Sequence, residues 1–399
     1  MYEKKINILI AIESFFDGGA EMFAIRLANE LSLTHRVCFV ELYPYLTTEK
    51  HQLSLLDQKR IKLFQPGKNW IGDWLFKDGL NEQTSVNGIR RKVTELYRLF
   101  KKRAVKFFIK KHNITIINSH SWDSDVYFSE LKKESAFTLI SSFHGHYAFL
   151  ADKRKNYDEI TRTSLNQIDG VIYTSPEQLK TLIHYQFAST KMHKIFYGLT
   201  LPLTTRTTRY QQGQCLQVVM AARGIKEKGW EEAILAVLDL QKKYPGLVEL
   251  SLVGEGQHLE YLKTKYNNPV IKFLGYKKDV IAIVKAAHVG ILPTYYIAES
   301  LPNTIIEYLF CGKPVITTNI GAIKEMILSE QQLAGSCVDL INDKVQVDLI
   351  TIAIEKYLID PVLVEKHSAI ALKAAEKFTM KKCIEDYLKV FNNSSQDNT

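Results

Sequence analysis

Short apolar runs alternate with stretches of helical spacing along almost the whole chain. Strands that alternate with helical segments are typical of parallel sheets covered by helices, so the pattern predicts an α/β fold. The runs that we expect as strands fall at 6–12, 36–42, 114–118, 137–142 and 170–174, and then at 216–221, 248–253, 270–273, 289–293 and 314–318.

The periodicity is interrupted between 198 and 214, where Thr, Pro, Gln and Gly replace the apolar pattern. A chain of 399 residues is long for one hydrophobic core. We therefore predict two Rossmann-like domains that face each other across a cleft, at 1–199 and 200–378. The polar end, 393–399, is expected to be disordered.

Composition narrows the class of protein. Apolar residues make up 46% and charged residues 24% of the chain, as in soluble globular proteins. The apolar runs are shorter than the ~18–20 residues that span a bilayer, and 6–12 reads as a core strand and not as a signal peptide. Five scattered cysteines without C-x-x-C spacing favour a reducing compartment over disulfides or a zinc site.

The net charge of +9 is concentrated in one segment, 90–111, where ten Lys or Arg residues accompany one acid, Glu95. Apolar residues recur there at helical spacing, which predicts a basic amphipathic helix. Two interpretations stay open: the helix lies on anionic lipid, or it packs its apolar stripe on the core. Nucleic acid is disfavoured because no zinc-finger or RNP-type motif accompanies the charge.

Two acids eight positions apart, Glu299 and Glu307, are the strongest candidates for a site. They follow the predicted strand 289–293 and stand on a loop and in the next helix, where an α/β sheet binds ligands. We expect Ser300 as the N-cap and Pro302 in the first turn, with free N–H groups for phosphate. Asn303 shares a helix face with Glu307, which could reach a ribose diol, while Glu299 could reach a sugar hydroxyl.

Two cations, Arg223 and Lys228, follow the predicted strand 216–221 among glycines that permit close backbone approach. Cations at a strand end suit a diphosphate leaving group, whose developing charge must be neutralised. A solvated turn is the alternative, with Lys226 as its solvent-facing member.

Weaker candidates follow strands of the first half. The pair Gly18-Gly19 opens a helix where backbone can approach a ligand. His144 directly follows a strand and can donate or accept a proton, ahead of His146 and His120. Asp123-Ser124-Asp125 matches a metal-binding D-x-D, but acids at a helix start also stabilise its dipole, and we favour that interpretation.

Together these segments resemble the retaining glycosyltransferases of family 4, which have the GT-B fold. The ordered match runs from the turn 18–21 through 143–145, Arg223…Lys228-Gly229, 252–256, 273–276 and 292–294. It closes with the E-x7-E of Glu299 and Glu307, then 312–315 and 321–325. Two positions depart from the pattern: Ser300 stands where the family often has Gly, and Tyr197 where it often has Asn.

The resemblance implies a nucleotide-sugar donor bound mainly by the second domain and an acceptor bound mainly by the first. Arg223 and Lys228 would hold the diphosphate, Glu307 the ribose and Glu299 the sugar, with His144 beside the sugar. Further contacts are implied for Gly18, Gly19, Gly254, Tyr276 near the base, Ser300, Leu301 and Asn303. The helix 379–392 would cross back onto the first domain, and neither a bound metal nor another cofactor is implied.

The resulting hypothesis is a hexosyltransferase that acts with retention on a UDP-sugar and a glycan or lipid-linked acceptor in bacterial surface polysaccharide or lipopolysaccharide synthesis. Its expected place is the cytoplasm, with peripheral attachment to the cytoplasmic face of the inner membrane as an option. The alternatives are an epimerase or hydrolase on the same fold and a non-catalytic nucleotide-sugar-binding subunit. A Rossmann dehydrogenase is disfavoured because no G-x-G-x-x-G follows the first strand.

Overall fold

The computed structural model describes residues 5–16, 18–46, 51–66, 68, 89–144, 156–204 and 208–396, without the side chains of 51, 89–91 and 395–396. The chain divides into two compact units. The first comprises Met1–Thr174, Gln178–Gly198 and Met380–Thr399, and the second Ser175–Glu177 and Leu199–Thr379. Each contains a parallel sheet, so the predicted α/β class is confirmed.

The first unit is built on a seven-stranded parallel sheet of order β3-β2-β1-β4-β5-β6-β7. The central strands are buried almost throughout, as expected for strands covered on both faces, and β1 is a nearly continuous apolar run. The strands are β1 (Asn7–Ile12), β2 (Arg36–Glu41), β3 (Lys62–Phe64), β4 (Ile116–Ser119), β5 (Thr138–Ser142), β6 (Gly170–Tyr173) and β7 (Met192–Lys194).

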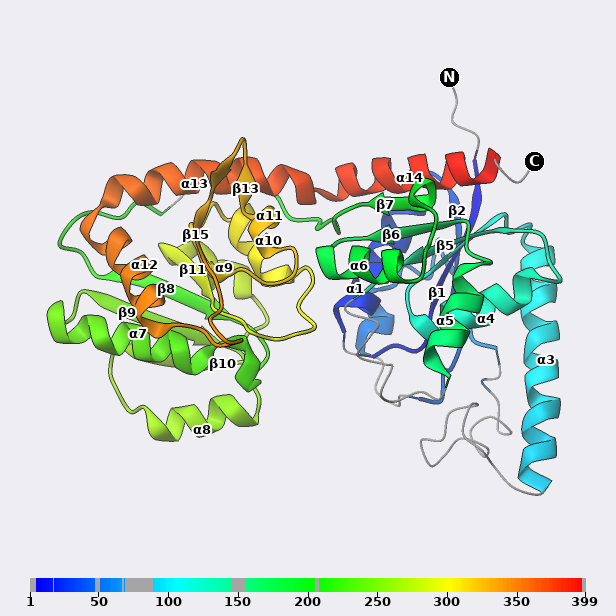
Figure 1. The fold of residues 1–399 in the computed structure, drawn as a ribbon, viewed down its shortest axis with the longest axis horizontal. Coiled ribbons are helices and arrows are strands. Elements are labelled where there is room, and N and C mark those ends of the chain that lie inside the picture. The colour runs from blue at the N-terminus through cyan, green and yellow to red at the C-terminus, as the bar shows by residue number, and fades with distance from the viewer. Residues whose placement is uncertain are drawn as a thin grey trace. The chain divides into compact units, whose positions relative to one another are not determined.

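Helices connect and cover these strands (Figure 1). The C-terminal helix α14 packs against α1 and β5, and Tyr387 Oη on α14 lies 3.0 Å from Ser142 Oγ at the end of β5. The helical elements are α1 (Gly19–Leu31), η1 (His51–Leu55), α3 (Ile89–Lys111), α4 (Trp122–Lys132), α5 (Tyr157–Leu165), α6 (Pro176–His184), η3 (Ser189–Lys191) and α14 (Met380–Gln396).

The second unit is built on a six-stranded parallel sheet of order β10-β9-β8-β11-β12-β15, beside a short antiparallel hairpin. Its strands are β8 (Leu216–Ala221), β9 (Val248–Val253), β10 (Ile271–Gly275), β11 (Val289–Leu292), β12 (Val315–Thr318), β13 (Leu328–Ser329), β14 (Gln332–Leu333) and β15 (Gly335–Val338).

In this unit α7 packs against α12, and α10 packs against α13, on opposite sides of the sheet (Figure 1). The helical elements are η4 (Lys226–Lys228), α7 (Trp230–Lys243), α8 (Gln257–Lys265), α9 (Val280–Ala286), α10 (Asn303–Phe310), α11 (Ile323–Met326), α12 (Val347–Ile359), α13 (Pro361–Ala375) and η5 (Glu376–Phe378). Among the described helices of the whole chain, none is long and apolar enough to cross a membrane.

All ten predicted strands are present, and the prediction missed five further ones: β3, β7, β13, β14 and β15. The predicted tail was also wrong over 393–396. Helix α14 continues to Gln396 because its last turns still bury Phe391 and Ser394 against the first unit. Residues 397–399 lie outside the described residues.

Candidate active site

Each parallel sheet has one point at which the strand order reverses. In the second unit this point lies between β8 and β11, and in the first unit between β1 and β4. In open α/β sheets ligands bind beyond the carboxyl ends of the strands at such a switch point. The candidate cations follow β8 and Glu299 follows β11, so the second unit brings both groups to its switch point.

The closest contact at this switch point joins Lys228 Nζ to Glu299 Oε2 at 2.5 Å. Each side chain is only 9% exposed. Thr294 Oγ1 lies 3.1 Å from the same carboxylate oxygen. The two residues that the sequence assigned separately to phosphate and sugar therefore form one largely buried ion pair.

Backbone contacts hold the two loops of this pair together. The carbonyl oxygen of Glu227 accepts the Tyr295 amide at 2.8 Å and lies 3.1 Å from Thr294 Oγ1. The 3₁₀ turn η4, which ends at Lys228, is thereby tied to the loop that follows β11. This connection explains why Lys228 and Glu299, 71 positions apart, meet.

Arg223 lies beside the same pair on an exposed loop. Its guanidinium carbon is 5.9 Å from the centre of the Tyr296 ring, and Lys228 Nζ is 5.1 Å from that centre. The fully buried Trp230 donates its indole N–H to the Arg223 carbonyl oxygen at 2.9 Å. Trp230 thus fixes the Arg223 backbone, and both cations lie over one aromatic ring.

Helix α10 begins differently from the prediction. Pro302, with φ −66° and ψ 121°, is the N-cap, no side chain caps the helix, and Asn303 is its first residue. Ser300 is instead held in the preceding loop, where its carbonyl oxygen accepts the Ala322 amide at 2.9 Å. The expected N-cap at Ser300 and first-turn place of Pro302 were therefore wrong, although the helix N-terminus still follows Glu299 directly.

The rest of α10 is anchored to the end of β8. Thr304 Oγ1 donates to the Ala221 carbonyl oxygen at 2.9 Å, and the buried Tyr308 hydroxyl accepts the Ala221 amide at 3.0 Å. Asn303 and Glu307 lie on this helix, both half-buried. Glu307 is thus one turn along a helix whose start is fixed beside the strand that leads to Arg223.

The predicted contacts Gly254 and Tyr276 lie on the neighbouring strand ends. The Gly254 amide donates to the Gly275 carbonyl oxygen at 3.1 Å, and Tyr276 follows with 67% of its surface exposed. The Gly224 amide donates to the Glu255 carbonyl oxygen at 2.7 Å, and a Cβ on Gly224 would lie 2.5 Å from that oxygen. The loops after β8 and β9 therefore touch through backbone, which only glycine permits there.

A second glycine supports the Glu299 loop. Gly321 has a φ of +58°, and a Cβ there would lie 2.4 Å from the Glu299 carbonyl oxygen. This left-handed conformation and close approach both require glycine. Leu301, which is buried, follows in the same loop.

In the first unit His144 belongs to a chain of hydrogen bonds at the carboxyl ends of β4 and β5. His144 Nε2 lies 2.8 Å from His120 Nδ1, and His144 Nδ1 lies 2.6 Å from the Tyr197 hydroxyl. His120 Nε2 lies 2.8 Å from Asn118 Oδ1. The Phe23 ring stacks on Tyr197 with 4.3 Å between ring centres.

For uncharged rings these contacts indicate the tautomers, with the Tyr197 hydroxyl shared between His144 Nδ1 and the Phe143 carbonyl oxygen, which lies 2.8 Å from it. The Asn118 amide nitrogen donates to Ile140 O and lies 3.0 Å from Ser142 Oγ, so its oxygen faces His120 and accepts from Nε2–H. His120 Nδ1 is then an acceptor, and His144 must donate its Nε2–H to it. Burial lowers the pKa of His144 to about 3 and lowers the pKa of His120 well below its ordinary value. Both rings are uncharged at neutral pH, so His144 is not poised as an imidazolium acid.

The glycine turn of the first unit is positioned by a buried acid. Gly18 is the N-cap of α1 and Gly19 its first residue. The fully buried Glu41, at the end of β2, accepts the Ser14 hydroxyl at 2.9 Å and the Phe15 amide at 3.2 Å. Glu41 therefore holds the loop that leads from β1 into the turn.

Two family models cover most of the chain. A model described as Glycosyltransferase Family 4 matches residues 17–201, and one described as Glycosyl transferases group 1 matches residues 216–352. The chain belongs to the family 4 glycosyltransferases.

Solved structures and a curated relative are similar to this family 4 glycosyltransferase. Anabaena HepE in complex with UDP has a TM-score of 0.70 at 16% identity and covers 97% of this chain and 100% of its own. The lipopolysaccharide outer core galactosyltransferase WaaB, in its apo form, has a TM-score of 0.70 at 13% identity and covers 97% and 99%. These likenesses show a common GT-B fold.

A glycogen synthase of Mycobacterium tuberculosis is 28% identical over 111 residues. The match covers 26% of this glycosyltransferase and 26% of that relative, so the chain spans about a quarter of the length of the first curated relatives that it matches.

The D-x-D of the glycosyltransferase lies in the first turn of α4. Ser121 caps this helix, and the carboxylate of the buried Asp125 accepts the Ser119 hydroxyl and, at 2.7 Å, the Ser141 hydroxyl. Asp123 is buried as well. The interpretation as a helix start is confirmed, and Asp125 links α4 to β4 and β5.

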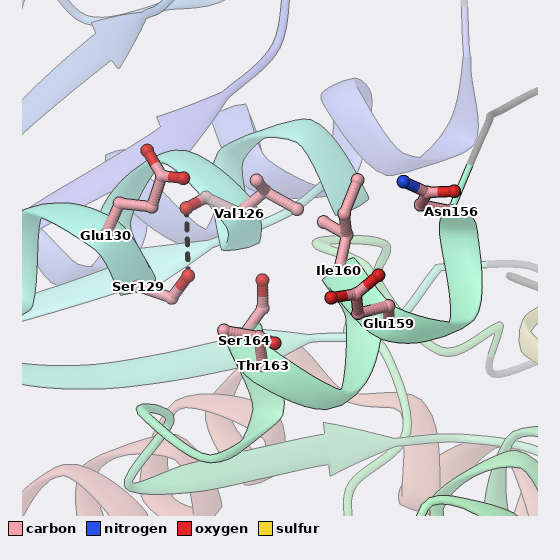
Figure 2. Close-up of a pocket in the computed structure, with 8 residues that line it drawn as sticks. All are labelled: Val126, Ser129, Glu130, Asn156, Glu159, Ile160, Thr163 and Ser164. Carbon is pink, nitrogen blue, oxygen red and sulfur yellow. Dashed lines mark hydrogen bonds between the residues drawn. The ribbon is translucent and has the colours of Figure 1, made fainter.

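One pocket of about 200 Å³ lies elsewhere, between α4 and α5 of the first unit. Figure 2 shows Glu130 and Ser129 on α4 opposite Glu159 and Ser164 on α5. None of the predicted site residues of the glycosyltransferase lines it. His146 and Gly145 lie outside the described residues.

Sequence reasoning missed several residues that hold the site. Thr294, Tyr296 and Trp230 organise the Lys228–Glu299 pair, and Tyr197 and Glu41 organise the first unit. Tyr197 had been noted only as a departure from the family pattern. Its position directly before the predicted domain boundary was the one signal available.

Proposed function

We propose that this protein transfers a hexosyl unit, with retention, from a nucleoside diphosphate sugar to an acceptor hydroxyl. A UDP-sugar is the favoured donor, and the acceptor is a glycan or lipid-linked glycan of bacterial surface polysaccharide or lipopolysaccharide synthesis. The observation that carries the proposal is the meeting of Arg223, Lys228 and Glu299 at the switch point of the second unit. The similarity to HepE, solved with UDP, and to the lipopolysaccharide outer core galactosyltransferase WaaB supports the choice of donor and acceptor.

The proposed donor pose separates the Lys228–Glu299 pair. Lys228 and Arg223 bind the diphosphate, aided by the amides of Ser300 and Leu301 in the loop before α10 and by Asn303 at the start of that helix. The carboxylate of Glu299 turns to the hydroxyls of the sugar. Glu307 binds the ribose, Gly254 and Tyr276 lie toward the base, and Gly18-Gly19 approaches the phosphates.

In the proposed reaction the acceptor hydroxyl attacks the anomeric carbon on the face from which the diphosphate departs. The bond between that carbon and the phosphate oxygen breaks as the new glycosidic bond forms, and the hydroxyl proton passes to the departing phosphate. Arg223 and Lys228 neutralise the charge that builds on the diphosphate. Glu299 orients the sugar and stabilises its positive charge. A covalent role as in retaining glycosidases would require a second acid ~5 Å away, and Glu307 is assigned to the ribose.

The role proposed for His144 differs from the proton transfer that its position in the sequence suggests. Because its ring is uncharged at neutral pH and both ring nitrogens contact His120 and Tyr197, we propose that it borders the donor sugar as a neutral group. It is not assigned as a proton donor.

The test is a donor screen followed by a transfer assay. Thermal shift with UDP-, GDP-, ADP- and dTDP-hexoses identifies the donor, since a ligand stabilises the folded protein in proportion to its affinity. The labelled donor is then incubated with and without a membrane glycolipid extract. We expect label in the acceptor fraction with retained anomeric configuration, and loss of this activity in Lys228→Ala. Release of free sugar or an epimer from the donor alone would instead indicate a hydrolase or an epimerase. Donor binding without turnover would indicate a binding subunit.

A further inference from the structure

Helix α3 of the first unit has an inner face that belongs to the core. Val105, Phe108 and Ile109 are buried, and the Phe108 ring stacks on Phe64 of β3 with 4.3 Å between ring centres. The ammonium of Lys101, also buried, lies 3.6 Å from the centre of the Tyr43 ring. The helix is therefore firmly attached to the β2–β3 edge of the sheet, and Figure 1 shows it along one side of that unit.

The outer face of α3 carries large apolar side chains that the described residues leave exposed. Leu96 is 55% exposed, Leu99 56%, Phe100 60% and Phe107 65%. Three of them, Leu96, Phe100 and Phe107, belong to the seven apolar positions whose spacing predicts the helix. The core therefore accounts for only part of that stripe.

Most described cations of α3 fall into two groups, apart from the buried Lys101 and from Arg98, which is exposed on the opposite side of the helix. Lys102 and Lys106 both pair with Glu134, next to α4. Lys92, Arg103, Lys110 and Lys111 are exposed, and no ion pair with a described acid neutralises them. The only acid on the helix, Glu95, stands apart from these four.

These four cations and the exposed apolar residues lie on the same side of the helix. At ~100° per residue, positions 92, 96, 99, 100, 103, 107, 110 and 111 fall within an arc of about 120°, whereas 95 lies outside it. The arc runs for roughly 30 Å along the axis. We call these eight residues the outer face: Lys92, Leu96, Leu99, Phe100, Arg103, Phe107, Lys110 and Lys111.

We propose that the outer face docks on the surface of an anionic lipid bilayer. An interfacial helix buries leucine and phenylalanine at the level of the acyl boundary, while lysine and arginine beside them bind anionic headgroups. The outer face has this composition, with apolar residues in the middle of the arc and cations among and beside them. Long basic side chains can extend from such a position to the headgroups.

Two other occupants fit the outer face less well. A duplex nucleic acid offers phosphates to the cations but no apolar surface for four leucine and phenylalanine side chains. A second copy of the chain, packed through the same face, would bring the four unpaired cations of each copy together without acids to neutralise them. The proposal does not depend on glycosyl transfer, because lipid binding can be measured without any donor.

The experiment is flotation of the full chain with vesicles, at low and high salt. One set contains phosphatidylcholine alone and the other contains phosphatidylglycerol as well. We expect binding to the anionic vesicles only, weakened by salt. We expect two double variants, Arg103→Glu/Lys110→Glu and Phe100→Ser/Phe107→Ser, each to reduce the partition coefficient at least tenfold. For the charge variant this follows because one cation near an anionic surface raises the partition coefficient about fivefold.

Matched variants of the first unit control for charge and for surface hydrophobicity. Lys180→Glu/Lys191→Glu makes the same change in net charge on exposed residues away from α3, and Leu33→Ser/Ile183→Ser removes two equally exposed apolar side chains. Both controls should bind as the wild type does. Circular dichroism of all variants verifies that they are folded.

Three outcomes would overturn the proposal. The first is the absence of binding of the wild type to anionic vesicles at low salt. The second is an equal loss of binding in the controls. The third is the absence of vesicle binding together with binding of duplex DNA in a gel-shift assay or formation of a dimer in sedimentation. If the Arg103→Glu/Lys110→Glu variant abolished the DNA binding, the outer face would be assigned to nucleic acid. If it abolished the dimer, the outer face would be assigned to a second copy of the chain.

Discussion

Replacing Glu299 by glutamine should tighten the binding of a free nucleoside diphosphate while it slows transfer. The Glu299 carboxylate pairs with the Lys228 ammonium at 2.5 Å, with both side chains 9% exposed. A diphosphate that binds Lys228 must displace or share this carboxylate. The substitution keeps the shape and the contact with Thr294 but removes the competing charge.

The magnitude follows from the contact that is weakened. A hydrogen bond to a charged group contributes about 1.5–3 kcal/mol and a neutral one about 0.5–1.5 kcal/mol, so the amide of the Glu299→Gln variant holds Lys228 about 1 kcal/mol less tightly than the carboxylate does. Removing a like charge beside the phosphates adds to this gain. We expect the affinity for the diphosphate to rise roughly fivefold to thirtyfold, or about 1–2 kcal/mol. Turnover should fall at least a hundredfold, because the carboxylate that stabilises the sugar in the transition state is lost.

The assay is calorimetric titration with the diphosphate alone, beside initial rates of transfer. The matched control is Glu227→Gln, which removes an acid next to Lys228 in η4 whose side chain is exposed and whose backbone carbonyl makes the contacts. This control should change the affinity less than twofold. The reasoning is refuted if Glu299→Gln binds the diphosphate as the wild type does or more weakly.

Three further predictions concern the supports of the site. Lys313→Met should lower the free energy of unfolding by about 2–4 kcal/mol in urea titrations, because the buried ammonium donates to the Lys285 and Ala287 carbonyl oxygens at 2.8 and 2.6 Å. The control Lys324→Met, at an exposed position, should leave the free energy of unfolding unchanged. Gly321→Ala, whose Cβ would lie 2.4 Å from Glu299 O, should cut the transfer rate by tenfold or more, and an unchanged rate would show that this loop is tolerant. Burial lowers the pKa of His144 from 6.5 to about 3, so the unfolded chain binds the proton first, and this residue should lower the free energy of unfolding by about 1.6 kcal/mol between pH 6.5 and 5, beside other buried histidines such as His120. His144→Asn should reduce the pH-dependent loss by that amount, and an equal loss in the variant would contradict the assigned cause.

Most of the strands that the sequence predicted are largely buried, and β10, a partly buried strand at a sheet edge, is an exception. The segments Leu216–Ala221 and Val248–Val253 are rich in apolar residues, and they match β8 and β9 at both ends. The missed strands β3, β7 and β15 lie at sheet edges and are half-buried or exposed, so no apolar run identifies them. Their pairing is decided by the neighbouring strand and not by local pattern.

The sequence predicted the main residues of the candidate site but not the contacts between them. Arg223, Lys228 and Glu299 could be named because each follows a recognisable strand. The direct pairing of Lys228 with Glu299 depends on the Glu227 carbonyl and Thr294, which carry no periodic signal. Likewise, the uncharged state of His144 follows from His120 and Tyr197, which reach it from distant parts of the chain.

The central claim is that Arg223 and Lys228 hold the diphosphate of a nucleotide sugar. Calorimetric titration of the wild type and of Arg223→Ala/Lys228→Ala with nucleoside diphosphates, UDP first, tests it most directly. We predict that one diphosphate binds the wild type and that the double variant binds it at least a hundredfold more weakly while it stays folded. Equal affinity in the double variant, or no binding of any nucleoside diphosphate to the wild type at millimolar concentration, would contradict the claim.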